Sequence, residues 1–233
     1  FRVRCSPLAK ITENDLIIEN DDLSKSDLNK IFKKIYSLAD SDVKKKVKEY
    51  FELGAVIEGF FMITGTLFGL RFREVENPSV WHEDVTMYEV LDDESERLMG
   101  RFYLDLYPRQ YKYQHAAEFN IVSGKKFGDT YQIPVASLVC NFPKPSKNHP
   151  SLLLHDDVET LFHEFGHLIH DIVSNTELVS QSGTSVAMDF VEAPSQLLEK
   201  WVWNKESLSL FAKHYRTGEA IPDTLVDRML AAR

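Results

Sequence analysis

The apolar positions of this chain change their period along the sequence, and each change marks a different kind of element. Between residues 22 and 50 they recur every three or four residues, which predicts two helices that meet near Ser41. The apolar stretch at 54–70 is about as short as a membrane span can be and carries Glu58 near its middle. A buried helix is therefore the better interpretation of this stretch.

Residues 80–142 are rich in β-branched and aromatic side chains, which is typical of strands. Four short runs are expected to be strands: 85–91, 98–108, 112–122 and 133–142. A polar connection between the first two runs predicts a hairpin, and residues 123–132 are expected to be a turn. From residue 155 the pattern is helical to the end. We therefore expect an α+β fold, mainly helical, with a small sheet beside the later helices.

Composition excludes some functions. The formal net charge of −9 argues against a nucleic-acid partner, because such a partner requires a basic face. Only Cys5 and Cys140 are present, so there is no disulfide framework. We expect a cytoplasmic monomer with no membrane partner, since the start shows no signal-peptide pattern. The start lacks a methionine and the end falls in a helical pattern, so we also expect a fragment of a longer protein.

The helix predicted from Asp156 to Ser174 carries the sequence HEFGH. His163 and His167 are four residues apart, so they lie one turn apart on one face, within reach of a single Zn²⁺. Glu164 points about 100° round the helix from His163. Its carboxylate is therefore placed to act as a general base toward a metal-bound water.

A catalytic zinc needs a third protein ligand, and Glu192 on the next predicted helix is our candidate. An intervening loop would bring it back to the histidines and complete the two-histidine, one-carboxylate set of hydrolytic zinc enzymes. Asp189 would lie one turn before it and accept the far N–H of a ligand histidine. Glu177 and Glu199 are rival third ligands, the first close to the end of the histidine helix and the second two turns beyond Glu192.

Three segments together resemble the thimet oligopeptidase and neurolysin family of zinc peptidases. They are GRFYLDLYPRQYKYQHAAEF, HDDVETLFHEFGHLIH and SGTSVAMDFVEAPSQLLEKWVW. The likeness runs from about residue 40 to the end of the chain. It implies a zincin-like catalytic core at 51–233, one Zn²⁺ per chain and short peptides as substrates. The helical pattern that precedes this core predicts an N-terminal helical segment at 1–50.

The resemblance also assigns roles to residues. His163, His167 and Glu192 match the family's zinc ligands, and Glu164 matches its catalytic glutamate. Three residues are expected to support the site from around it: Glu159, His170 and Asp189. Ser185 stands where thimet oligopeptidase and neurolysin have a histidine, so one minor contact of the family is not carried over.

A C-terminal feature of the family is missing here. Its members carry a His-Xaa-Xaa-Gly-Tyr pattern and nearby tyrosines that bind substrate and stabilise the oxyanion. In this chain His214 is followed by YRTGEA instead. Two hypotheses follow: a zinc-dependent endopeptidase that hydrolyses short peptides, or a zinc-binding segment that is catalytically silent by itself or serves as an interaction domain.

A peptide substrate often binds a zinc peptidase by adding a strand to the exposed edge of a sheet. The segment KYQHAAEF is expected to be that edge, with His115, Ala116 and Ala117 in contact with the substrate. The competing segment VASLVCNF has a continuous apolar pattern, which suits a buried strand better.

Overall fold

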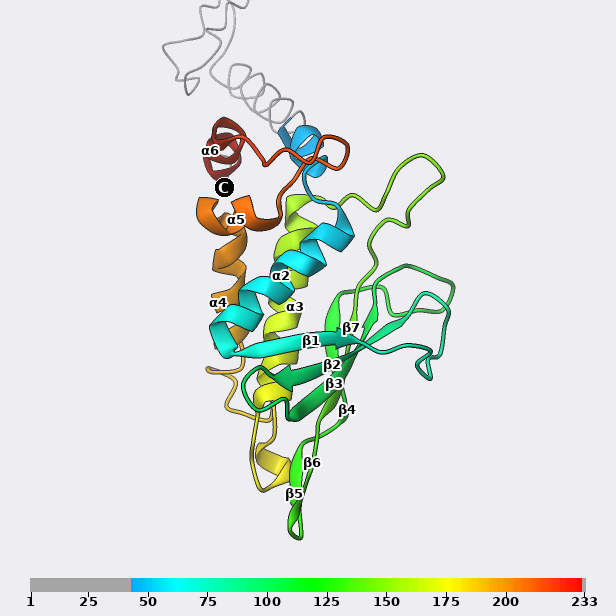
Figure 1. The fold of residues 1–233 in the computed structure, drawn as a ribbon, viewed down its shortest axis with the longest axis vertical. Helices are drawn as coiled ribbons and strands as arrows, with labels where there is room; N and C mark the ends of the chain where they lie inside the picture. Colours follow the sequence, from blue (N-terminus) through cyan, green and yellow to red (C-terminus); the bar gives the residue numbers. More distant parts are fainter. Residues whose placement is uncertain (1–42, 232–233) are drawn as a thin grey trace, which may run out of the picture. The chain divides into compact units, whose positions relative to one another are not determined.

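A computed structural model describes residues 43–231 and shows an α+β fold, which confirms the predicted class (Figure 1). The helices are α2 (Leu53–Phe68), α3 (His155–Val173), α4 (Ala193–Glu199), α5 (Lys205–Phe211), α6 (Asp223–Ala231) and the short 3-10 helices η1 (Val179–Gln181) and η2 (Lys200–Trp203). The strands are β1 (Leu70–Glu74), β2 (Thr86–Asp92), β3 (Leu98–Asp105), β4 (Ala117–Val122), β5 (Lys125–Phe127), β6 (Thr130–Gln132) and β7 (Val135–Val139).

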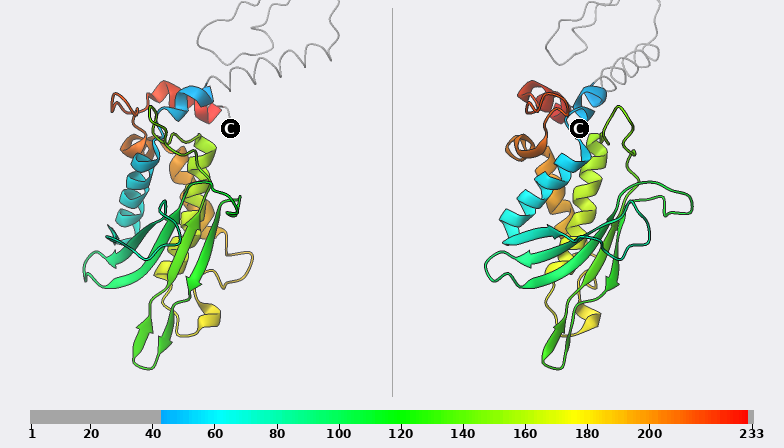
Figure 2. Two further views of the ribbon diagram at one scale, coloured as in Figure 1. Left: turned by 90° about the vertical axis from the view of Figure 1, so that its right-hand side faces the viewer. Right: turned by 45° about the vertical axis from the view of Figure 1, so that its right-hand side comes forward.

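Five strands form one mixed sheet in the order β1-β2-β3-β7-β4. The predicted hairpin is the antiparallel pair β2–β3, whereas β3 and β7 run parallel. Figure 2, left, looks onto this sheet with α3 behind it, and α3 contacts β3, β7 and β4. The arrangement leaves β4 at an edge of the sheet and β7 in its interior, as the patterns of the two segments predicted.

Several predicted boundaries were wrong. The helix expected at 54–70 ends at Phe68, because Gly69 adopts a left-handed conformation (φ 64°) that caps the helix, and β1 then begins at Leu70. Residues 123–132, expected to be a turn, form a second hairpin from β5 and β6. Gly128 at φ 62° supplies its turn, and Figure 1 shows this hairpin projecting beyond the main sheet.

The strand expected at 112–122 begins only at Ala117, and the loop before it is tied through Arg109 and Lys112 to a polar cluster around Asp105. The Asp105 carboxylate accepts bonds from Arg109 at 2.6 and 2.7 Å and from the indole of Trp81 at 2.9 Å. Lys112 pairs with it at 2.9 Å and also donates to main-chain carbonyls at the ends of β3 and β7. Burial alone would raise the pKa of Asp105, but these donors lower it to about 2.

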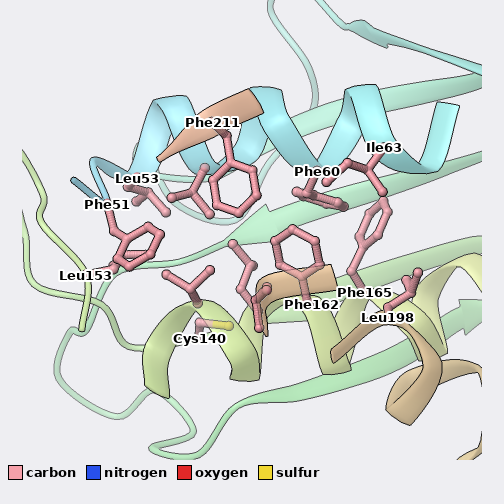
Figure 3. Close-up of a cluster of buried hydrophobic side chains, with 14 of the residues drawn as sticks. Phe51, Leu53, Phe60, Ile63, Cys140, Leu153, Phe162, Phe165, Leu198 and Phe211 are labelled. Carbon is pink, nitrogen blue, oxygen red and sulfur yellow. The ribbon is translucent and has the colours of Figure 1, made fainter. Parts of the chain in front are cut away.

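The core lies between α2, α3 and α5, where aromatic side chains meet (Figure 3). The ring of Phe60 lies edge-on to Phe165 with 3.7 Å between centroids, and Phe162 packs against both Phe60 and Phe211. The opposite face of α2 is exposed, with Met62 at 51%, so this helix is buried on one side only. Within residues 43–231 no helix has the length and apolar content needed to cross a bilayer.

The first helix expected near the N-terminus lies outside the described residues. Residues 43–48 of the second are helical. Val43 and Val47 are buried in the same core as Phe51, which explains the apolar spacing in this otherwise lysine-rich segment.

Candidate metal centre

Helix α3 directs His163 and His167 toward α4 because its apolar residues face the core on another side of the helix. Val158, Leu161 and Phe165 are fully buried in the core. The side chains of His163 and His167 keep exposures of 27% and 13% and face α4, which packs along α3. The amphipathic pattern that predicted the helix thus also decides which way the histidines point.

The two histidines meet Glu192 in a compact cluster. Oε2 of Glu192 lies 3.3 Å from Nε2 of His163 and 3.1 Å from Nε2 of His167. Ligands bound tetrahedrally at zinc's usual 2.0–2.1 Å are separated by about 3.3 Å, so these spacings fit a shared zinc ion. Among residues 43–231 this is the one group of three histidine, cysteine or acidic side chains close enough to hold a metal.

Glu192 does not lie inside the second helix, as the sequence led us to expect, but immediately before it. It is the N-cap of α4, and Pro194 stands in the first turn, where its missing N–H costs no hydrogen bond. Ser195 donates its hydroxyl to Oε2 of Glu192 at 2.7 Å. That bond, followed by the two nearby histidines, lowers the pKa of Glu192 and keeps it anionic.

Gly166 allows α4 to approach α3 this closely. A Cβ at this position would lie 2.4 Å from Cα of Ser195, which is closer than real contacts allow. The glycine of HEFGH therefore sets the distance between the two helices, and with it the reach of Glu192 to the histidines.

The outer nitrogen of His163 is held by Glu199, at the other end of α4. Its Oε1 lies 2.6 Å from Nδ1 of His163. If Nδ1 carries the proton, the lone pair of Nε2 faces Glu192. Glu199 was a rival third ligand, but here it contacts the outer nitrogen of a histidine, which is the contact expected of Asp189. Asp189 itself is exposed in the turn before α4. Glu177, the other rival, is exposed and pairs with Lys126.

The other two residues predicted to support the site, His170 and Glu159, differ in whether their polar atoms have hydrogen-bond partners. Nδ1 of His167 and Nδ1 of His170 are buried and find no hydrogen-bond partner among residues 43–231. Burial, and then the nearby His167, lowers the pKa of His170, whose ring meets Phe190 edge-on. Glu159 accepts the indole N–H of Trp203 at 2.6 Å, so in this structure it ties α3 to η2.

Glu164 contacts the edge of the sheet. Its Oε2 accepts the backbone N–H of Glu118, on β4, at 3.0 Å. Among the three predicted substrate residues, Ala117 begins β4 and pairs with Val139, Ala116 packs partly buried against the core, and His115 is exposed. The general base predicted from HEFGH therefore stands beside the edge strand predicted for substrate.

Acidic side chains from β4 and α3 face one another next to Glu164. Burial, and then Asp171 and Glu164, raises the pKa of Glu118 to about 8. Burial also raises the pKa of Asp171, which accepts the side-chain N–H of Asn120 at 2.6 Å. Sequence reasoning missed this group, although the alternation of Glu118 and Asn120 along a strand places them on one face.

Similarity to known proteins identifies the family of this chain. The sequence profile of Peptidase family M3 matches residues 9–233. The chain belongs to peptidase family M3. Among its M3 relatives, the thimet-like oligopeptidase of Dictyostelium discoideum is 46% identical over 80% of this chain. Saccharolysin of Saccharomyces cerevisiae is 46% identical over 81%, and oligopeptidase A of Escherichia coli is 40% identical over 85%.

The matched region is a small part of these M3 proteins. It spans 28% of the length of the first two and 29% of the third. The match to the family profile extends over all the described residues, so it includes both the histidine helix and the edge strand. The family suggested by the motifs is thereby confirmed.

Proposed function

We propose that this chain forms the metal-binding core of a zinc-dependent oligopeptidase that hydrolyses short peptides. One observation carries the proposal: two histidine nitrogens and a carboxylate oxygen converge at metal-ligand spacing, next to a glutamate that is not part of the set. Family membership and the names of the relatives support the same reaction class.

His163, His167 and Glu192 would hold one zinc ion. A zinc ion bound there supplies Lewis acidity, which polarises a carbonyl and makes a water molecule easier to deprotonate. Glu199 orients the ring of His163 through Nδ1, as carboxylates commonly do for ligand histidines. Ser195 restrains the carboxylate of Glu192 by donating its hydroxyl to Oε2.

Glu164 would act as general base and then as general acid. Its carboxylate takes a proton from the attacking water as the new C–O bond forms at the scissile carbonyl. It then gives that proton to the amine nitrogen as the C–N bond breaks. The peptide would lie along the edge of β4 that faces away from β7, near Ala117 at the start of the strand and His115 and Ala116 just before it.

A second candidate is a segment that binds zinc but does not catalyse. The observation in its favour is that the 233 residues contain no His-Xaa-Xaa-Gly-Tyr pattern, which supplies substrate and oxyanion contacts in the thimet oligopeptidase and neurolysin family. Loss of one oxyanion donor typically reduces turnover by about 10²–10³. The chain would then bind zinc but cleave peptides very slowly.

One experiment separates these functions. The purified chain is stripped of metal, titrated with zinc, and assayed with an internally quenched short peptide. We expect one zinc per chain and slow hydrolysis that disappears when zinc is removed and returns when it is restored. Stoichiometric zinc without zinc-dependent hydrolysis would favour the silent segment, and no zinc binding would contradict both functions.

A further inference from the structure

One backbone N–H on the edge of β4 that faces away from β7 already donates a hydrogen bond to a side chain. In an antiparallel pair, successive residues point their N–H and C=O groups alternately toward and away from the neighbouring strand. The register opposes Glu118 to Leu138 of β7. The N–H of Glu118 instead donates to Glu164 on α3, so it points away from β7.

Both partners of this bond are attached to rigid elements. Glu164 lies between His163 and Phe165 on α3, and Phe165 is fully buried in the core. β4 is paired with β7, which lies inside the sheet. A hydrogen bond from a neutral donor to a carboxylate is stronger than one between neutral groups, so it can restrain the glutamate rotamer.

We propose that the backbone N–H of Glu118 is a positioning group for Glu164. By holding Oε2 it leaves Oε1 free to face the attacking water. This inference rests on the general-base role proposed for Glu164. It also restricts the substrate: a peptide strand added to β4 must leave this N–H to Glu164 and pair with edge groups two residues away, at Ala116 or Asn120.

The donor can be removed without removing the pairing of β4. Proline lacks an N–H and is tolerated on edge strands where that N–H does not face the neighbouring strand. Glu118→Pro and Glu118→Ala both lose the carboxyl group, and only the alanine variant keeps the donor. We expect equal zinc content in the two variants, a kcat about 10–100-fold lower for Glu118→Pro, and KM values within about threefold of each other.

Amide hydrogen exchange followed by NMR tests the contact without relying on activity. In the zinc-loaded chain, Glu164→Ala removes the acceptor, and we expect exchange of the Glu118 amide to become at least about tenfold faster, since it loses its hydrogen bond. The amide of Phe119, which faces β7, is the internal control and should keep its rate.

These measurements distinguish failure of the inference from failure of the proposed function. Equal kcat values for the proline and alanine variants, or unchanged exchange at Glu118 in Glu164→Ala, would overturn the positioning role. A chain that cleaves no peptide at all would refute the peptidase function alone, and the exchange rate of Glu118 would then decide whether the N–H holds Glu164.

Discussion

At the scale of single residues, three glutamates near the histidines differ in what they face. Glu192 faces the Nε2 atoms of both histidines, Glu199 faces Nδ1 of His163, and Glu164 faces the backbone of β4. These different surroundings suit the three roles proposed above for glutamates, which are metal ligand, support of a ligand and general base. Substitution by glutamine, which preserves shape, separates them.

The first prediction separates ligand from base. Glu192→Gln should lose most of its zinc on dialysis against a weak chelator, because a neutral amide is a poorer ligand than a carboxylate. Glu164→Gln should keep one zinc per chain and lose hydrolysis by at least about 100-fold. Metal analysis and the peptide assay measure both outcomes. Full zinc retention in Glu192→Gln together with loss in Glu164→Gln would reverse the assignment.

The second prediction concerns the outer nitrogen of His163. Glu199→Ala should weaken zinc affinity by about 10–100-fold, since it removes the acceptor that orients the ring. Asp189→Ala is the matched control, because it removes an exposed carboxylate from the turn before α4. Competition with a fluorescent zinc chelator gives both constants. A larger loss in Asp189→Ala than in Glu199→Ala would restore the original expectation for Asp189.

At the scale of elements, the site depends on the close approach of α4 to α3 at Gly166. Gly166→Ala should push the helices apart, lower zinc affinity by about tenfold or more, and destabilise the fold by about 1–3 kcal/mol through overpacking. Gly54→Ala is the matched control: it adds the same methyl group to α2, where the three nearest atoms all belong to the end of the Glu52 side chain. Equal effects of the two substitutions would contradict this account.

Much of the element order could be predicted from the sequence because periodicity records which side of an element is buried. That information gave α3 and the β2–β3 hairpin. It did not give β1, because Leu70 also completes the apolar stretch of α2 and only the left-handed Gly69 separates strand from helix. The alternation of Leu70 and Phe72 with charged residues is nevertheless a strand signal. Periodicity also missed the β5–β6 hairpin, whose strands are three residues long.

In the candidate site, too, the residues of a single helix could be predicted from the sequence, whereas the contacts between elements could not. His163, Glu164 and His167 follow from the local geometry of one helix, so spacing alone places them. The contact between Glu199 and His163 joins two elements and depends on where α4 begins, although a separation of seven residues from Glu192 places both on one helical face. The contact between Glu118 and Glu164 has no local signal, because it depends on the position of β4 in the sheet.

At the scale of the whole molecule, the buried carboxyl of Asp105 and the partly buried carboxyl of Glu118 give the free energy of unfolding opposite dependences on pH. The pKa of Asp105, about 2, lies below its ordinary value of 3.8, so its stabilisation is present above about pH 4 and lost as the pH falls toward 2. The pKa of Glu118, about 8, lies above its ordinary 4.5. The folded state then holds a proton that the unfolded state releases, and stability falls as the pH rises from 4.5 to 8.

The corresponding prediction is that Glu118→Gln stabilises the fold by about 1–2 kcal/mol at pH 8, after allowance for partial exposure, and by much less at pH 4. Denaturant unfolding at the two pH values measures it. Glu94→Gln, in the exposed β2–β3 turn, is the control and should change stability by less than about 0.5 kcal/mol at either pH. A gain confined to pH 4 would contradict the sign.

The open edge of β4 also bears on how copies of the chain behave in concentrated solution. An unpaired edge strand is a template for a strand from another molecule, and here Phe119 (43% exposed) and Ile121 (49% exposed) give it an apolar surface. We expect reversible association at high concentration, weakened by Ile121→Lys and, if peptides dock on this edge, by saturating peptide. Sedimentation velocity would detect both effects. If a peptide docks on this edge, the backbone groups that receive it are the same groups that a strand of a neighbouring molecule would use, so substrate binding and self-association would compete.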